Sequence, residues 1–128
     1  MVSTIETLQT IFQAQAALEI AVLVGSRADG TAKDNSDWDI ALRWTKQTAP
    51  VDQLMLTEKL RQEICASTSL HPDKIDFIDL ASAKLAMRAL VANKGRVLKG
   101  ENSLPWIHFL SYTWGQMEDF SWRQSHAI

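Results

Sequence analysis

The sequence is poor in several features that would place it in a specialised class of protein. It has a single cysteine, Cys65, so no disulfide can form within the chain, and a reducing cytoplasm is the expected compartment. No apolar run is long enough to span a bilayer, and the N-terminal residues lack the basic and then apolar pattern of a secretory signal. We therefore expect a cytoplasmic protein that makes no membrane contact.

The chain also lacks a strong charge of either sign. The formal net charge is −2, and the lysines and arginines are scattered, so no direct nucleic-acid binding is expected. The three histidines, His71, His108 and His126, do not have the spacing of metal ligands. A chain of 128 residues, 22% of them charged, fits one globular domain over residues 1–128.

Hydrophobic periodicity predicts an alternation of helices and strands. The expected helices cover about residues 4–18, 50–67, 83–93 behind a cap at Ser82, and 103 to near the end. The expected strands cover residues 20–24, 37–44 and 74–80, with a short fourth strand at 96–98. This order predicts an α/β fold, with helices packed on a small mixed β-sheet.

A glycine and a serine stand where the first expected strand ends. Gly25 allows a sharp turn and the close approach of a phosphate group, and the Ser26 hydroxyl adds a donor. If a helical turn begins at Ser26, its free N–H groups point at an anion. Arg27 or Lys33 would then neutralise phosphate charge. Taken alone, however, a Gly-Ser pair is more simply explained as an ordinary turn.

Two carboxylates open the second expected strand. Asp37 and Asp39 alternate with the apolar Trp38, so they share one face of the strand at a separation of roughly 6–7 Å. Carboxylates at this spacing can both reach a pair of hard cations, as in the two-metal sites of phosphoryl and nucleotidyl transfer. A solvated strand edge is the alternative interpretation.

A third carboxylate, Asp76, lies within the apolar strand at residues 74–80. An acid in a buried strand is costly unless it is paired, hydrogen-bonded or bound to metal. If this strand lies beside the strand at 37–44, three carboxylates converge, and the third can help to remove the proton from an attacking hydroxyl. Asp79 points to the opposite face and is expected to be a turn or cap residue.

Together these residues resemble the nucleotidyltransferase superfamily of DNA polymerase beta. The hallmark of that superfamily is Gly-Ser, a spacer, Asp-x-Asp and a third Asp on a later strand, matched here by Gly25, Ser26, Asp37, Asp39 and Asp76. The resemblance covers roughly residues 18–100 and implies a polymerase beta-like core.

The resemblance also implies a role for each residue of the motif. It implies a catalytic set that also binds Mg²⁺, formed by Asp37, Asp39 and Asp76. It implies nucleotide- and phosphate-binding positions at Gly25, Ser26, Arg27 and Ser36. ATP is expected as the nucleotide on the same ground, because no residue of the sequence can be assigned to reading the base.

The C-terminal segment, residues 103–128, holds most of the aromatic residues of the chain. One helical stripe, able to pack on the sheet, consists of Trp106, Phe109, Leu110, Thr113, Met117 and Phe120. Trp114 and Trp122 fall outside this stripe, so the helix is apolar on more than one side. Because tryptophan is favoured at interfaces, we expect the segment to contribute to a partner interface; a larger core that wraps the helix is the alternative.

The small catalytic core and the aromatic helix resemble a minimal nucleotidyltransferase of the MNT type. Such proteins are paired with HEPN-domain ribonuclease toxins. The resemblance implies an antitoxin that transfers AMP from ATP to a tyrosine hydroxyl of its HEPN partner and so neutralises it. Two alternatives remain at this point: a small-molecule nucleotidyltransferase, for example one acting on aminoglycosides, and a non-catalytic antitoxin that acts by binding alone.

Overall fold

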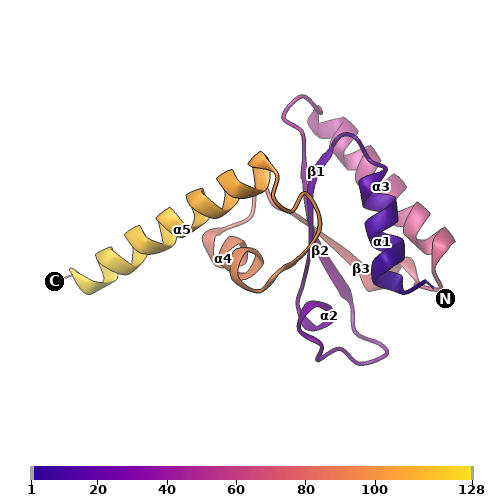
Figure 1. Ribbon diagram of the computed structural model, residues 1–128, viewed down its shortest axis with the longest axis horizontal. Coiled ribbons are helices and arrows are strands. Elements are labelled where there is room, and N and C mark those ends of the chain that lie inside the picture. The colour runs from indigo at the N-terminus through magenta and orange to yellow at the C-terminus, as the bar shows by residue number, and fades with distance from the viewer. Residues whose placement is uncertain (1, 128) are drawn as a thin grey trace.

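The computed structural model describes residues 2–127, in which a four-stranded mixed sheet lies between two layers of helices (Figure 1). The strands are β1 (Leu18–Val24), β2 (Trp38–Trp44), β3 (Ile75–Asp79) and β4 (Arg96–Lys99), in the spatial order β3-β2-β1-β4. β1 is antiparallel to β2 and to β4, whereas β2 and β3 are parallel. Parallel neighbours need a crossover connection, which here contains a long helix. The expected mixed α/β fold is confirmed.

The helices follow the predicted order. They are α1 (Thr4–Gln13), the short α2 (Ser26–Asp29), α3 (Pro50–Ser67), α4 (Leu85–Lys94) and α5 (Leu104–Ser125), with a 3₁₀ turn, η1, at Pro72–Lys74. Within residues 2–127, none of these helices combines the length and the apolar character needed to cross a bilayer.

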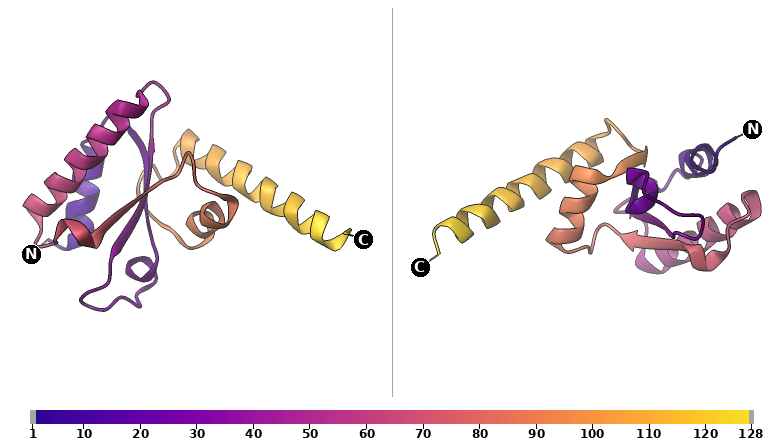
Figure 2. Two further views of the ribbon diagram at one scale, coloured as in Figure 1. Left: turned by 180° about the vertical axis from the view of Figure 1, so that it is seen from behind. Right: turned by 90° about the horizontal axis from the view of Figure 1, so that it is seen from below.

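One face of the sheet is covered by α1 and α3 (Figures 1 and 2). Phe12 of α1 and Leu60 and Ile64 of α3 are fully buried there. They pack against the apolar face of β2, which Trp38 and Ile40 provide together with Leu42 and Trp44. The predicted inward face of this strand is therefore confirmed.

The opposite face is covered by α4 and by the first half of α5 (Figure 2). Val91, Trp106 and Phe109 pack there against β1 and against Ala41 of β2. β1 is covered on both faces, which explains why its residues 20–24 are a continuous apolar run rather than an alternating one.

The predicted extent of the first helix, residues 4–18, is wrong. α1 ends at Gln13, and β1 already begins at Leu18, which pairs with Trp44 and is 1% exposed. The backbone N–H of Thr45 donates to the carbonyl of Ala17 at 2.8 Å, so the chain is part of the sheet from this point. Alanines between Gln13 and Leu18 suit a helix, but tertiary pairing decides the conformation here.

The predicted cap of the fourth helix is also wrong, because α4 begins after Lys84 rather than at Ser82. The hydroxyl of Ser82 donates to Asp79 Oδ2 at 2.9 Å, and the N–H of Ala81 donates to Asp79 Oδ1 at 3.1 Å. Asp79 is thus the turn residue that the sequence predicts, and it engages the hydroxyl that would otherwise cap the helix.

α5 projects beyond the sheet, so only its first half is covered (Figure 1). Trp106, Phe109 and Thr113 are buried, but Phe120 is 56% exposed. The expectation that Phe120 packs on the sheet is therefore wrong, because the helix is longer than the surface beneath it. Trp114 and Trp122 are exposed, in keeping with their position off the stripe.

The N-terminus of α5 offers a stability test. Ser103 Oγ accepts the N–H of Trp106 at 3.3 Å and donates to the carbonyl of Gly100 at 2.6 Å. Replacing Ser103 by Ala should lower the free energy of unfolding by about 1 kcal/mol, measured by urea denaturation. Ser111→Ala, at an exposed position within the same helix, should leave stability unchanged or slightly higher. Equal losses in the two variants would contradict a capping role.

Candidate active site

The turn after β1 has a conformation that favours glycine. Gly25 has φ 75° and ψ −156°, and α2 starts at the next residue, Ser26. A Cβ atom at Gly25 would lie 2.9 Å from Asp39 Oδ2, closer than such contacts normally come. Val24 and Asp39 are partners in the β1–β2 ladder, which brings the turn beside that carboxylate. The backbone conformation at this position therefore requires glycine, and an added side chain would displace the Asp39 carboxylate.

The sheet brings the three predicted carboxylates to one region. Asp39 and Asp76 are direct partners in the parallel β2–β3 ladder, where neighbouring strands lie about 4.8 Å apart. Asp37 stands just before β2 and, like Asp76, is exposed, whereas Asp39 is half-buried. The expectation that Asp76 is buried in its strand is wrong, since β3 is an edge strand whose face is open at this residue.

The electrostatics of the site centre on Asp39. Burial raises the pKa of the Asp39 carboxyl above its usual range, and the negative charges of Asp76 and then Asp37 raise it further. A carboxylate that is desolvated and surrounded by like charge attracts a proton or another cation. The three acids therefore concentrate negative charge beside the glycine turn.

The loop between α2 and β2 is held together by residues that the sequence assigned to phosphate. The Arg27 guanidinium lies 4.8 Å from the centre of the Trp38 ring, and its Nη2 donates to the carbonyls of Ser36 at 2.9 Å and Asp34 at 3.2 Å. Ser36 Oγ accepts the backbone N–H of Lys33 at 2.8 Å. Phosphate contacts by Arg27 and Ser36 stay predictions, and their contacts in this structure are to the loop itself.

Lys74 is a residue of the site that sequence reasoning missed. Its Nζ lies 3.9 Å from Asp37 Oδ1 and donates to the carbonyl of Asn35 at 3.0 Å. Lys74 is the last residue of the 3₁₀ turn that precedes β3, so strand alternation does not predict where its side chain lies. It supplies the positive charge nearest to Asp37 among the described ion pairs.

The carboxylates of the site are suited to binding magnesium only if further oxygen ligands, from water or phosphate, complete the shell of the ion. Among residues 2–127, no three His, Cys, Asp or Glu side chains are placed to hold a metal ion on their own. Mg²⁺ typically binds one or two carboxylates and completes its shell with water and phosphate oxygens. The register pair Asp39–Asp76 matches that requirement, since it offers two adjacent carboxylates with an open side.

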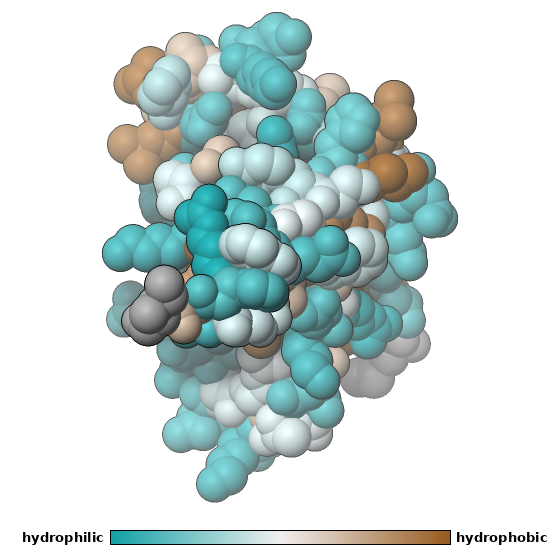
Figure 3. Space-filling model, turned by 90° about the vertical axis from the view of Figure 1, so that its left-hand side faces the viewer, coloured by the Kyte–Doolittle hydropathy of each residue, from teal (hydrophilic) through white to brown (hydrophobic). Residues whose placement is uncertain are grey.

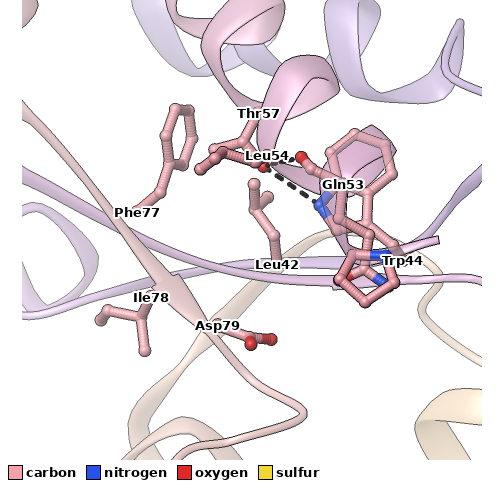
Figure 4. A pocket seen from close by; sticks show the side chains of 9 residues that line it. Leu42, Trp44, Gln53, Leu54, Thr57, Phe77, Ile78 and Asp79 are labelled. Carbon is pink, nitrogen blue, oxygen red and sulfur yellow. Dashed lines mark hydrogen bonds between the residues drawn. The ribbon is translucent and has the colours of Figure 1, made fainter. Parts of the chain in front are cut away.

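One cavity lies away from the acids, between α3 and the β2–β3 edge (Figure 4). It has a volume of about 280 Å³, and Leu42, Leu54 and Phe77 contribute to its apolar wall. Its polar groups are already paired, because Thr57 Oγ1 accepts Trp44 Nε1 at 3.2 Å and donates to a backbone carbonyl of α3. The candidate site is therefore defined by the carboxylates and the glycine turn, not by this cavity.

This geometry agrees with the comparison to known families. Residues 6–104 match the family described as polymerase beta, nucleotidyltransferase. The chain belongs to this nucleotidyltransferase family. The matched range contains the glycine turn and all three carboxylates, from Gly25 to Asp76.

A curated relative of this nucleotidyltransferase is the protein adenylyltransferase MntA of Aphanizomenon flos-aquae (strain 2012/KM1/D3). The two are 31% identical over 91 residues, which is 66% of this chain and 58% of the relative. The chain thus spans less than two thirds of the length of that relative.

Solved structures share the fold over nearly the whole chain. A toxin–antitoxin crystallised with AMP-PNP has a TM-score of 0.68 and 23% identity, covering 94% of this chain and 93% of that one. A tri-AMPylated Shewanella oneidensis HEPN toxin in complex with MNT antitoxin gives a TM-score of 0.62 and 19% identity, covering 95% and 91%. At sequence identities this low, the structural similarity establishes that these proteins share a fold.

The raised pKa of Asp39 predicts how the stability of the nucleotidyltransferase depends on pH. The folded state favours the protonated carboxyl, so ionised Asp39 is destabilising, and its cost develops as the pH rises from the usual Asp range through the raised pKa. Asp39→Asn should therefore have a higher Tm than the wild type at pH 7 in EDTA. That difference should shrink as the pH is lowered, and a difference independent of pH would contradict the electrostatic cause.

Proposed function

We propose that this nucleotidyltransferase transfers AMP from ATP to a tyrosine hydroxyl of a partner HEPN ribonuclease toxin and thereby neutralises the toxin. The observation that carries the proposal is the convergence of Asp37, Asp39 and Asp76 beside the Gly25 turn. Two comparisons support it: the curated relative is a protein adenylyltransferase, and a structure of the same fold is an MNT antitoxin with a tri-AMPylated HEPN toxin.

In this proposal, each residue of the site has its own role in binding the nucleotide. Gly25 leaves room for the β- and γ-phosphates beside Asp39, and the Ser26 hydroxyl donates to them. Asp37, Asp39 and Asp76 are the residues that would hold Mg²⁺. The metal supplies positive charge that offsets the negative charge developing on the transferred group. Arg27 keeps the loop between α2 and β2 in place through its contacts with Trp38 and the loop carbonyls.

The transfer is an in-line displacement at the α-phosphorus. The tyrosine oxygen forms a bond to the α-phosphorus while the bond from that phosphorus to the bridging oxygen breaks, and pyrophosphate leaves. The Asp76 carboxylate takes the proton of the attacking hydroxyl. Asp76 suits this role because it is exposed on an edge strand, where a hydroxyl from another molecule can reach it.

The partner is expected at α5 as well as at the active site. Tyr112, Trp114, Phe120 and Trp122 are all exposed along this projecting helix. From the side to which α5 projects, hydrophobic groups lie among hydrophilic ones over the surface (Figure 3). Exposed tryptophan and tyrosine supply much of the energy of protein interfaces, so we propose residues 103–128 as part of the toxin-binding surface.

The free Cys65 suits a reducing cytoplasm, where such a pair of toxin and antitoxin would act.

Label transfer tests the proposal directly. The purified protein is mixed with ATP labelled at the α-phosphate, Mg²⁺ and the HEPN partner, beside an Asp37→Ala/Asp39→Ala variant and an EDTA control. Label should move to the partner only with the wild-type protein and Mg²⁺. Label on the partner with both proteins, or with neither, would contradict the assignment. Neutralisation that survives in the double variant would indicate inhibition by binding alone.

A further inference from the structure

A second cavity, of about 480 Å³, lies on the α4–α5 side of the sheet, beyond the C-terminal end of β2. It is bounded by the end of β2, the loop between β3 and α4, and the first half of α5. Its polar lining includes the side chains of Arg43, Lys46, Arg88, His108, Tyr112 and Thr113. We refer to it as the cationic cavity.

The charged residues that line the cationic cavity are all basic. Arg43, Lys46 and Arg88 line it, and no Asp or Glu is among the lining residues. Arg43 Nε lies 3.8 Å from Glu19 Oε2, a distance at the limit of an ion pair. The chain as a whole has a net charge of −2, so this concentration of positive charge is local. Such a cavity attracts anions.

Two buried polar atoms of the lining residues lack partners. Arg88 Nη1 is buried and makes no hydrogen bond, although Nε of the same group donates to the carbonyl of Ala83 at 3.1 Å. Thr113 is 0% exposed, and its Oγ1 also has no hydrogen-bond partner. Buried donors are nearly always satisfied, and an acceptor within the cavity would satisfy both. A guanidinium and a hydroxyl both donate to phosphate oxygens.

The cationic cavity is separate from the carboxylates. Asp39 and Arg43 share a face of β2 but are four residues apart, a Cα separation of roughly 13 Å. Ala41 lies between them and is fully buried beneath the helices. A single phosphate group cannot contact both regions.

We propose that the cationic cavity is a second ligand site, specific for a phosphate-bearing small anion. Arg88 and Thr113 would donate to the phosphate oxygens from the inner wall, with Lys46 and Arg43 adding charge at the end of β2. Tyr112, whose ring lies 5.4 Å from the Arg88 guanidinium, stands at the rim and is 64% exposed. The outer side of the cavity is open beside this ring, so a group attached to the phosphate can extend out of the cavity.

Calorimetric titration of the full chain in EDTA tests this proposal. Inorganic phosphate, pyrophosphate and AMP are the three probes, and EDTA removes metal-dependent binding at the carboxylates. We expect one site per chain for at least one probe. Tighter binding of AMP than of inorganic phosphate would identify a nucleotide as the ligand, whereas the reverse order would identify a free phosphate.

Matched variants locate the binding. Lys46→Gln should weaken binding by about tenfold, since a charge-assisted contact is lost. Lys94→Gln makes the same charge change at an exposed position outside the cavity and should keep wild-type affinity. The Asp37→Ala/Asp39→Ala variant should still bind. In amide NMR spectra, the probe should shift Thr113 and not Ser26.

Three results would overturn the proposal. They are the absence of binding by all three probes, equal weakening by Lys46→Gln and Lys94→Gln, and shifts that centre on Ser26. None of them depends on AMP transfer, so a failure here is distinguishable from a failure of the proposed activity.

Discussion

Replacing Asp39 by Asn should lower the rate of AMP transfer by at least about 10³-fold, or about 4 kcal/mol in activation free energy. The substitution removes the carboxylate that lies against the Gly25 turn and pairs in register with Asp76. It keeps the size of the side chain, so the site loses a cation ligand while its shape is preserved. The measurement is the initial rate of label transfer from ATP to the HEPN partner.

Asp79→Asn is the matched control for that variant. It also removes one negative charge, but the Asp79 carboxylate accepts from Ala81 and Ser82 in the turn after β3. Its transfer rate should stay within a few-fold of wild type, with about 1 kcal/mol lost from the free energy of unfolding. Equal loss of activity in both variants would mean that net charge, rather than the Asp39 position, determines the rate.

Replacing Gly25 by Ala should impair stability and activity together. The φ of 75° and ψ of −156° belong to a region that only glycine adopts readily, so the strain should cost about 1–3 kcal/mol in free energy of unfolding. The added Cβ, 2.9 Å from Asp39 Oδ2, should also displace that carboxylate. Denaturation and transfer rates, measured on the same preparation, separate the two effects.

Gly30→Ala separates strain from steric displacement. Gly30 has φ 80°, but an added Cβ would meet no atom within 4 Å. This variant should lose about 1 kcal/mol of stability and keep its transfer rate. If Gly25→Ala keeps its rate as well, the contact with Asp39 is unimportant for the reaction.

Much of the fold was predictable because local patterns agree with the tertiary structure. The alternation in β2 places Trp38 and Ile40 in the core, and the same alternation places Asp39 on the other face. The apolar run of β1 identifies a strand covered on both sides. Local patterns do not reveal the order of the strands in the sheet. That order pairs β2 with β3 and so places Asp39 beside Asp76.

The errors arise where tertiary context decides. The residues after Gln13 suit a helix, but Leu18 pairs with Trp44 in the sheet. Phe120 continues an apolar stripe, yet α5 has no sheet beneath it at that point (Figure 1). The contact of Lys74 with Asp37 joins two segments whose proximity depends on strand order, and no local periodicity reveals it.

The parallel pairing of β2 and β3 has a consequence for the timing of synthesis. The 18-residue α3 separates the second carboxylate from the third, so the ladder partners Asp39 and Asp76 are delivered by distant parts of the chain. A nascent chain that has emerged only through Trp44 carries the glycine turn and two acids. Because domains emerge from the ribosome N-terminus first, any ligand that needs all three carboxylates can bind only after α3 has packed and β3 has joined the sheet. Occupancy of the site therefore reports that the chain has folded at least as far as β3.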